Sequence, residues 1–188
     1  LPIKKAKSEN VEQVEIDIEN IKPREKVDLS EIKEVGGDFV RISGKKIPVD
    51  YEIVEAKDLL TSNDELGNIN KDYPQYLQNR DRARKELVLQ VNSIAENIEP
   101  ERLGKNVVAT EGAPIVMGDN IVAMGNGRAQ AVKLAYVKGK AEGYKEYLKQ
   151  QGFNIDGFDK PVLVRKMRGE YSENVMRNLI EDANIAGT

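Results

Sequence analysis

Residues 121–131 have the sequence IVAMGNGRAQA, in which an apolar run meets two glycines and then an alanine-rich segment. The run 121–124 has the length and composition of a short buried strand. After Gly127 the apolar residues recur at helical spacing, as at Ala131, Leu134 and Ala135. The sequence therefore predicts a strand, a tight glycine turn and a helix, one after another.

The predicted turn, Gly125-Asn126-Gly127-Arg128, has the features of an anion site. Two glycines let the backbone approach a ligand without side-chain obstruction, and the unpaired amides of a helix start attract anions. The guanidinium of Arg128 adds a planar set of donors that suits phosphate or carboxylate. A plain tight turn with a surface arginine explains the same residues, and the motif alone leaves both readings open.

Two further segments carry candidate site residues. Gln78, Arg80 and Arg82 supply amide and guanidinium groups that could converge on the same anion, although a loop salt-bridged through the intervening acid explains them equally well. Glu181 and Asn184 supply oxygen ligands that could hold Mg²⁺ beside a nucleotide, because this ion prefers a few carboxylates together with phosphate oxygens. An exposed helix end is the alternative for that pair.

Short strands and helices alternate along the rest of the chain, which predicts a mixed α/β (α+β) domain. We expect strands at 14–18, 39–42, 47–49, 51–54, 107–109, 113–116 and 161–167. We expect helices at 29–35, 87–98 and 139–150 and one that begins after Ser172 as its N-cap, with a long polar loop at 61–79. Residues 1–45 are interpreted as an extension or the tail of a preceding module, and residues 46–188 as the domain.

Length and composition exclude several classes of protein. A chain of 188 residues suits one domain with a hydrophobic core, and the lack of cysteine and histidine excludes disulfides, thiolate zinc sites and a histidine base. The net charge of -3 argues against a general nucleic-acid binder, but basic residues outnumber acidic ones between Met124 and Arg168, which could attract phosphate.

The ends of the chain and its hydropathy bear on where the protein works. No window approaches a membrane span and the start lacks the apolar stretch of a secretory signal, so we expect a cytoplasmic protein with no membrane partner. Because the first residue is Leu1, we expect a piece of a larger polypeptide with further domains.

The order of these segments resembles a known superfamily. Tyr73-Pro74, Leu77-Gln78-x-Arg80, Glu111-Gly112-Ala113-Pro114-Ile115-Val116 and Gly125-Asn126-Gly127-Arg128 together resemble the ParB/sulfiredoxin-like superfamily, and more narrowly the DdrB-like ParB domains of phage and mobile-element proteins. The resemblance covers roughly Val49 to Asn184. It implies a small mixed sheet with flanking helices.

The resemblance also implies a function. In ParB-type proteins the glycine-arginine motif binds the triphosphate of a nucleotide, typically CTP, and a later Glu-Asn-x-x-Arg motif completes the site with Mg²⁺. Here Asn126 stands where those proteins usually carry Glu, and residues 181–184 follow the second motif only loosely. Sulfiredoxin chemistry needs a cysteine in the turn, which this chain lacks.

Three functional hypotheses follow from the sequence. The first is a nucleotide-binding ParB-like domain, of CTP or ATP type, that could also be an NTPase. The second is a metal-dependent DNA-binding or nuclease domain that uses the same basic residues, in a groove, to bind a DNA backbone. The third is a non-catalytic interaction scaffold.

Overall fold

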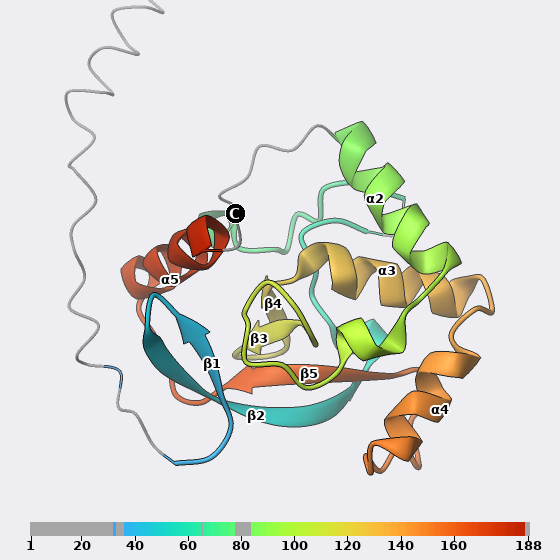
Figure 1. Ribbon diagram of the computed structural model, residues 1–188. Coiled ribbons are helices and arrows are strands. Elements are labelled where there is room, and N and C mark those ends of the chain that lie inside the picture. The colour runs from blue at the N-terminus through green and yellow to red at the C-terminus, as the bar shows by residue number, and fades with distance from the viewer. Residues whose placement is uncertain (1–31, 33–35, 65, 78–83, 187–188) are drawn as a thin grey trace, which may run out of the picture.

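The computed structural model of the protein describes residues 32, 36–64, 66–77 and 84–186 (Figure 1). A five-stranded mixed sheet runs through it in the order β1-β2-β5-β3-β4. Its strands are β1 (Phe39–Ile42), β2 (Lys45–Glu55), β3 (Ile115–Met117), β4 (Ile121–Met124) and β5 (Pro161–Met167). The pair β3 and β5 is parallel and the other neighbours are antiparallel. The predicted α+β class is confirmed.

Four α-helices flank the sheet in the described part of the chain. They are α2 (Arg84–Glu96), α3 (Asn126–Val137), α4 (Glu142–Gln150) and α5 (Glu173–Ala186). In Figure 1, α3 lies between α2 and the sheet, and α5 lies beside β1. α4 lies near the N-terminal end of β5. Short 3-10 helices η2 (Ala56–Asp58), η3 (Gln75–Leu77) and η4 (Pro100–Leu103) lie in the connecting segments.

Alanines let α2 and α3 approach closely. Ala95 of α2 and Ala131 and Ala135 of α3 are fully buried in one cluster with Val91 and Leu134. Small side chains at such a contact allow two helix backbones to lie near each other, and the apolar area they bury stabilises the pair. This packing fixes where α3 begins, and therefore where the glycine turn lies.

Several elements agree with the sequence prediction. β5 has the predicted bounds, and β1 and β2 form a hairpin through Ser43 and Gly44, which both have positive φ. α5 begins directly after Ser172, whose hydroxyl accepts a hydrogen bond from the amide of Val175 at 3.3 Å. The N-cap prediction is therefore confirmed.

The predicted strand at 107–109 is wrong. These residues lie in the connection between η4 and β3, and Val107 and Val108 are 44% and 43% exposed. The backbone makes one bridge there, between Arg41 and Val108, instead of a ladder. An apolar run of three residues is too short for its periodicity to separate a strand from an ordered loop.

The predicted boundary at residue 45 falls inside the β1–β2 hairpin. Residues 39–42 pair with residues 45–48, and Val40 and Ile42 are each 1% exposed, so this part of the proposed extension belongs to the same folded unit. The predicted strand at 14–18 lies outside the described residues, as does the predicted helix at 29–35 apart from Ile32, which is buried. Their interpretation stays a prediction.

Helices of membrane-spanning length and hydropathy are absent from the described part of the chain. The predicted cytoplasmic location stays a prediction.

Candidate functional site

The glycine turn lies where the sequence predicts it, between the end of β4 and the start of α3. Gly125 is the N-cap of α3 and has φ 87° and ψ 31°, a left-handed conformation that glycine adopts without strain. The carbonyl of Gly125 accepts the first helical hydrogen bond, from the amide of Ala129 at 2.9 Å. The amides of Asn126, Gly127 and Arg128 come before that bond, and none has a partner among the described residues.

The side chain of Arg128 folds back over this turn. A β-carbon at position 125 would lie 2.6 Å from Nη2 and 3.0 Å from Cζ of Arg128, so the guanidinium occupies the space above the glycine. It donates hydrogen bonds to the carbonyls of Gly112 at 2.5 Å and Ala109 at 3.2 Å. Of the five N–H groups of a guanidinium, three therefore have no partner in the described part of the chain.

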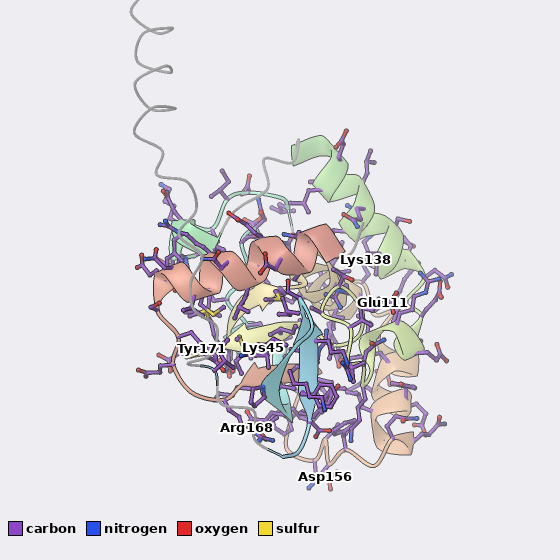
Figure 2. All side chains as sticks on the ribbon, turned by 60° about the vertical axis from the view of Figure 1, so that its left-hand side comes forward. Lys45, Glu111, Lys138, Asp156, Arg168 and Tyr171 are labelled. Carbon is purple, nitrogen blue, oxygen red and sulfur yellow. The ribbon has the colours of Figure 1, made fainter. Side chains whose placement is uncertain are left out.

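Burial lowers the pKa of Arg128 to about 10, and the nearby carboxylate of Glu111 opposes this shift. The guanidinium therefore stays charged at neutral pH. Glu111, which Figure 2 labels, is an exposed residue of the loop between η4 and β3. The turn thus combines a helix start, a fixed cation and unused donors, which are the features that bind anions.

Asn126 connects the turn to the long loop at 61–79. Its Oδ1 accepts a hydrogen bond from the amide of Ser62 at 2.8 Å, and its Nδ2 donates to Tyr73 Oη at 3.1 Å and to the carbonyl of Val122 at 3.3 Å. A carboxylate could accept from Ser62 but could not donate to Val122. The position where the resembling proteins carry Glu therefore has a structural role in this chain.

Arg165 was not predicted from the sequence as a site residue. It lies on β5 with no exposed surface, and its guanidinium donates to carbonyls of the loop 106–113, including that of Ala109, which also accepts from Arg128. The only signal in the sequence is an arginine that directly follows the apolar run 161–164, at the register of Leu163 and Met167. That signal identifies a buried cation but not its partners.

Gln78, Arg80 and Arg82 lie outside the described residues, so their predicted role stays a prediction. The residue that precedes them, Leu77, packs in one buried cluster with Met124, which precedes the glycine turn. The described chain before that segment therefore ends, at Leu77, in the same buried cluster as the residue before the turn.

Glu181 and Asn184 lie on α5, in half-buried positions. The adjoining residues Ile180 and Ala183 belong to the same buried cluster as Met124. A spacing of three residues places the two side chains on neighbouring parts of one helix face. In the described ranges no three His, Cys, Asp or Glu side chains form a metal-binding group, so a cation here would need ligands from elsewhere, such as phosphate oxygens.

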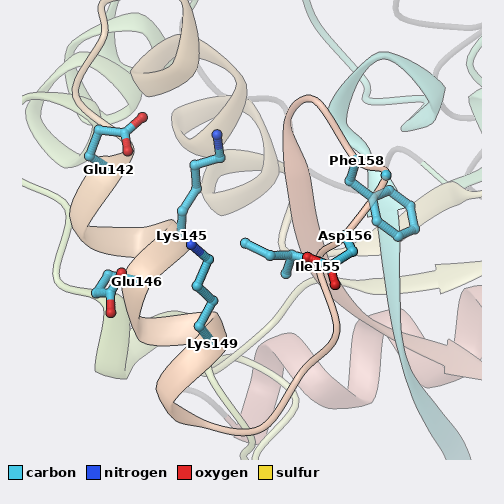
Figure 3. A pocket seen from close by; sticks show the side chains of 8 residues that line it. Glu142, Lys145, Glu146, Lys149, Ile155, Asp156 and Phe158 are labelled. Atoms are coloured by element: carbon cyan, nitrogen blue, oxygen red, sulfur yellow. The ribbon is translucent and has the colours of Figure 1, made fainter.

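A separate cavity of about 280 Å³ lies between α4 and the loop 155–158 (Figure 3). Lys145 and Lys149 line it together with Glu142, Glu146 and Asp156. Charges of both signs are mixed there, and none of the predicted site residues contributes. This cavity is distinct from the glycine turn.

Comparison with known proteins identifies a family whose model matches this chain. The model of the ddrB-like ParB superfamily domain matches residues 42–168, which is more than half of the chain and includes the glycine turn, the loop 106–113 and Arg165. No curated protein and no solved structure matches. The matched residues run from the end of β1 through β5, so that the family region holds most of the sheet. The chain belongs to the ddrB-like ParB superfamily.

Proposed function

We propose that this domain binds the phosphates of a nucleotide, of CTP or ATP type, at the N-terminus of α3. The observation that carries the proposal is the arrangement at Gly125. The helix begins with three backbone amides that have no hydrogen-bond partner in the described ranges. The guanidinium of Arg128 lies over the glycine, and three of its N–H groups also have no partner there. A polyphosphate can accept from both sets at once.

Donors that are already fixed in place bind an anion more favourably than the donors of a flexible basic side chain. Arg128 is held by two backbone carbonyls, so less conformational freedom is lost when it meets a ligand than for a free surface arginine. Family membership supports the same assignment, because the resemblance implies that the glycine-arginine motif receives the triphosphate. In this proposal Gln78, Arg80 and Arg82 add donors to the same anion.

We propose Mg²⁺ as the accompanying cation, held by Glu181 and Asn184. One carboxylate and one amide are hard oxygen ligands, and Mg²⁺ commonly completes its shell with substrate phosphates and water. When bound, the ion would neutralise part of the phosphate charge. The packing of α5 against the cluster that contains Met124 supports this pairing. The proposal covers binding, and no residue is assigned to hydrolysis.

A thermal-shift and calorimetry screen tests the proposal. The purified chain is titrated with CTP, ATP, GTP and their diphosphates, with and without Mg²⁺, alongside Arg128→Lys. This change keeps the charge but removes the planar donors. The matched control is Arg102→Lys, because Arg102 is an exposed arginine on η4 whose partner is Glu99.

A ligand that binds the folded state raises the melting temperature by mass action. We expect a selective rise that Arg128→Lys removes and Arg102→Lys keeps. An equal rise in both variants, or no rise with any nucleotide, contradicts the proposal. Release of inorganic phosphate in the same samples tests NTPase activity. Binding to DNA that falls steeply with salt, without nucleotide preference, would favour the DNA-binding alternative instead.

A further inference from the structure

The loop 106–113 supports the guanidinium of Arg128. Its carbonyls at Gly112 and Ala109 accept the two hydrogen bonds of that side chain. The loop carries no regular secondary structure, since it connects η4 to β3. The position of Arg128 over Gly125 therefore depends on whatever holds this loop in place.

Arg165 of β5 holds the loop 106–113 in place through its guanidinium. Its Nε donates to the carbonyl of Ala113 at 2.7 Å, and its Nη1 donates to the carbonyls of Asn106 at 2.7 Å and Val108 at 2.9 Å. Its Nη2 donates to the carbonyl of Ala109 at 3.4 Å and to that of Glu111. All five N–H groups of this buried side chain are thus used on a single loop.

Tyr51 of β2 holds the beginning of the same loop. Its hydroxyl accepts a hydrogen bond from the amide of Asn106 at 2.9 Å and donates to the carbonyl of Asn106 at 3.1 Å. Tyr51 of β2 and Arg165 of β5 are directly opposite each other in the register of the β2–β5 ladder. The sheet therefore fixes the loop through two adjacent anchors.

Fully buried Arg165 and half-buried Arg128 differ in how many of their N–H donors already have a partner. Arg165 has no donor left for a ligand, whereas Arg128 has three N–H groups without a partner in the described part of the chain. Arg165 is suited to fix the loop 106–113, and Arg128 is suited to bind an anion. Ala109, whose carbonyl accepts from both, couples their positions.

We propose that Arg165 is a positioning residue of the phosphate site: it orders the loop 106–113 so that Gly112 and Ala109 hold the Arg128 guanidinium over Gly125. This inference rests on the proposed function and adds to it the group that prepares the site. The two cations that lie together there suit the polyphosphate ligand already proposed.

The electrostatics of the pair agree with this ligand class. Burial and, to a smaller extent, the neighbouring charge of Arg128 together lower the pKa of Arg165 to about 10. The acid that raises the pKa of Arg128 is Glu111, a single carboxylate on the exposed side of the loop. Two guanidinium groups beside one carboxylate leave excess positive charge, which a polyanion would balance.

A double-mutant cycle tests the positioning role. Binding of inorganic tripolyphosphate is measured by calorimetry for the wild type, Arg165→Lys, Arg128→Lys and the double variant, with Arg102→Lys as the control. Arg165→Lys keeps a positive charge, but its ammonium group has three N–H donors and cannot donate to all five carbonyls at once. If Arg165 acts through Arg128, its substitution weakens binding about tenfold in the wild-type background and changes it little in the Arg128→Lys background.

Two results would overturn the inference while leaving the proposed function intact. One is wild-type affinity in Arg165→Lys, and the other is an equal loss of affinity in both backgrounds, which a merely structural role predicts. Failure of the wild type to bind tripolyphosphate or any nucleotide would refute the proposed function, and the positioning role with it.

A second variant covers the case in which Arg165→Lys does not fold. Tyr51→Phe removes both hydrogen bonds to Asn106 and keeps the aromatic ring, so it loosens the same loop by a smaller change. It enters the same cycle with Arg128→Lys. We expect a weaker but similarly coupled loss of affinity, and additive effects of the two substitutions would refute the positioning role.

Discussion

Two glycines in one motif are expected to respond in opposite directions to the same substitution. Gly125 has φ 87° and lies beneath the guanidinium of Arg128, whereas Gly127 is helical, and outside its own helix nothing lies closer than Gln90 Oε1, 4.0 Å from a β-carbon built there. The substitutions Gly125→Ala and Gly127→Ala add the same methyl group two residues apart. Any difference between them therefore reports the local geometry.

The structure gives the size of each effect. For Gly125→Ala, the left-handed backbone costs about 1–2 kcal/mol, and the 2.6 Å approach to Nη2 displaces Arg128 from two hydrogen bonds worth about 1 kcal/mol each. The total is a loss of about 3–4 kcal/mol in the free energy of unfolding. For Gly127→Ala, the removal of helical glycine stabilises the protein by up to about 1 kcal/mol.

Urea unfolding followed by circular dichroism measures both free energies. We expect Gly125→Ala to have a lower midpoint than the wild type and Gly127→Ala an equal or higher one, with unchanged slopes. A Gly125→Ala protein as stable as the wild type would refute the described turn, because either the left-handed conformation or the overlying guanidinium would then be absent. A similar loss in both variants would show that the motif tolerates no side chain for a reason other than this geometry.

Two further predictions concern residues outside the turn. Hydrogen bonds from Lys138 and Lys140 lower the pKa of Glu96 to about 2. The ion pairs of this carboxylate therefore stabilise the protein fully above the ordinary pKa of a glutamate, and this stabilisation is lost as the pH falls through about 2. Glu96→Gln should therefore lower the melting temperature at pH 7 but not near pH 2, and an equal decrease at both values would contradict the ion pairs. Tyr73→Phe removes the hydroxyl that donates to the carbonyl of Val122 at 2.6 Å and accepts from Asn126 at 3.1 Å, and should cost about 1–3 kcal/mol in urea unfolding. Tyr171→Phe, at a half-buried tyrosine, is its matched control, and an equal effect of the two would contradict the role of the Tyr73 hydrogen bonds.

Much of the fold follows from local patterns in the sequence. The segment 161–167, which begins with the apolar run 161–164, predicts β5 with its bounds. The change of period after Gly127 predicts α3, and Ser172 marks the start of α5. These features depend on residues within a few positions of one another. Hydrophobic periodicity, left-handed glycine and N-cap hydrogen bonds are all properties of short segments.

The same reasoning predicted the position of the glycine turn but not the contacts of its side chains. Arg128 was expected to offer its donors to an anion, and the structure places two of them on the carbonyls of Gly112 and Ala109. Asn126 was expected in the same phosphate-binding turn, and its side-chain amide is hydrogen-bonded to Ser62, Tyr73 and Val122. The failed strand prediction at 107–109 has a related cause, because β1 and Arg165 hold that segment as a loop.

The sequence by itself determined the α+β class, the order of the motifs and the strand–turn–helix unit at 121–131. Only the tertiary structure decided which groups surround that unit. Arg165 and Ala113 are 52 residues apart and Asn126 and Ser62 are 64 apart, so no local pattern records either contact. Periodicity specifies which face of an element is buried, but the partner of a buried polar group depends on how the whole sheet and its loops pack, and a buried guanidinium must satisfy its donors wherever carbonyls are brought within reach.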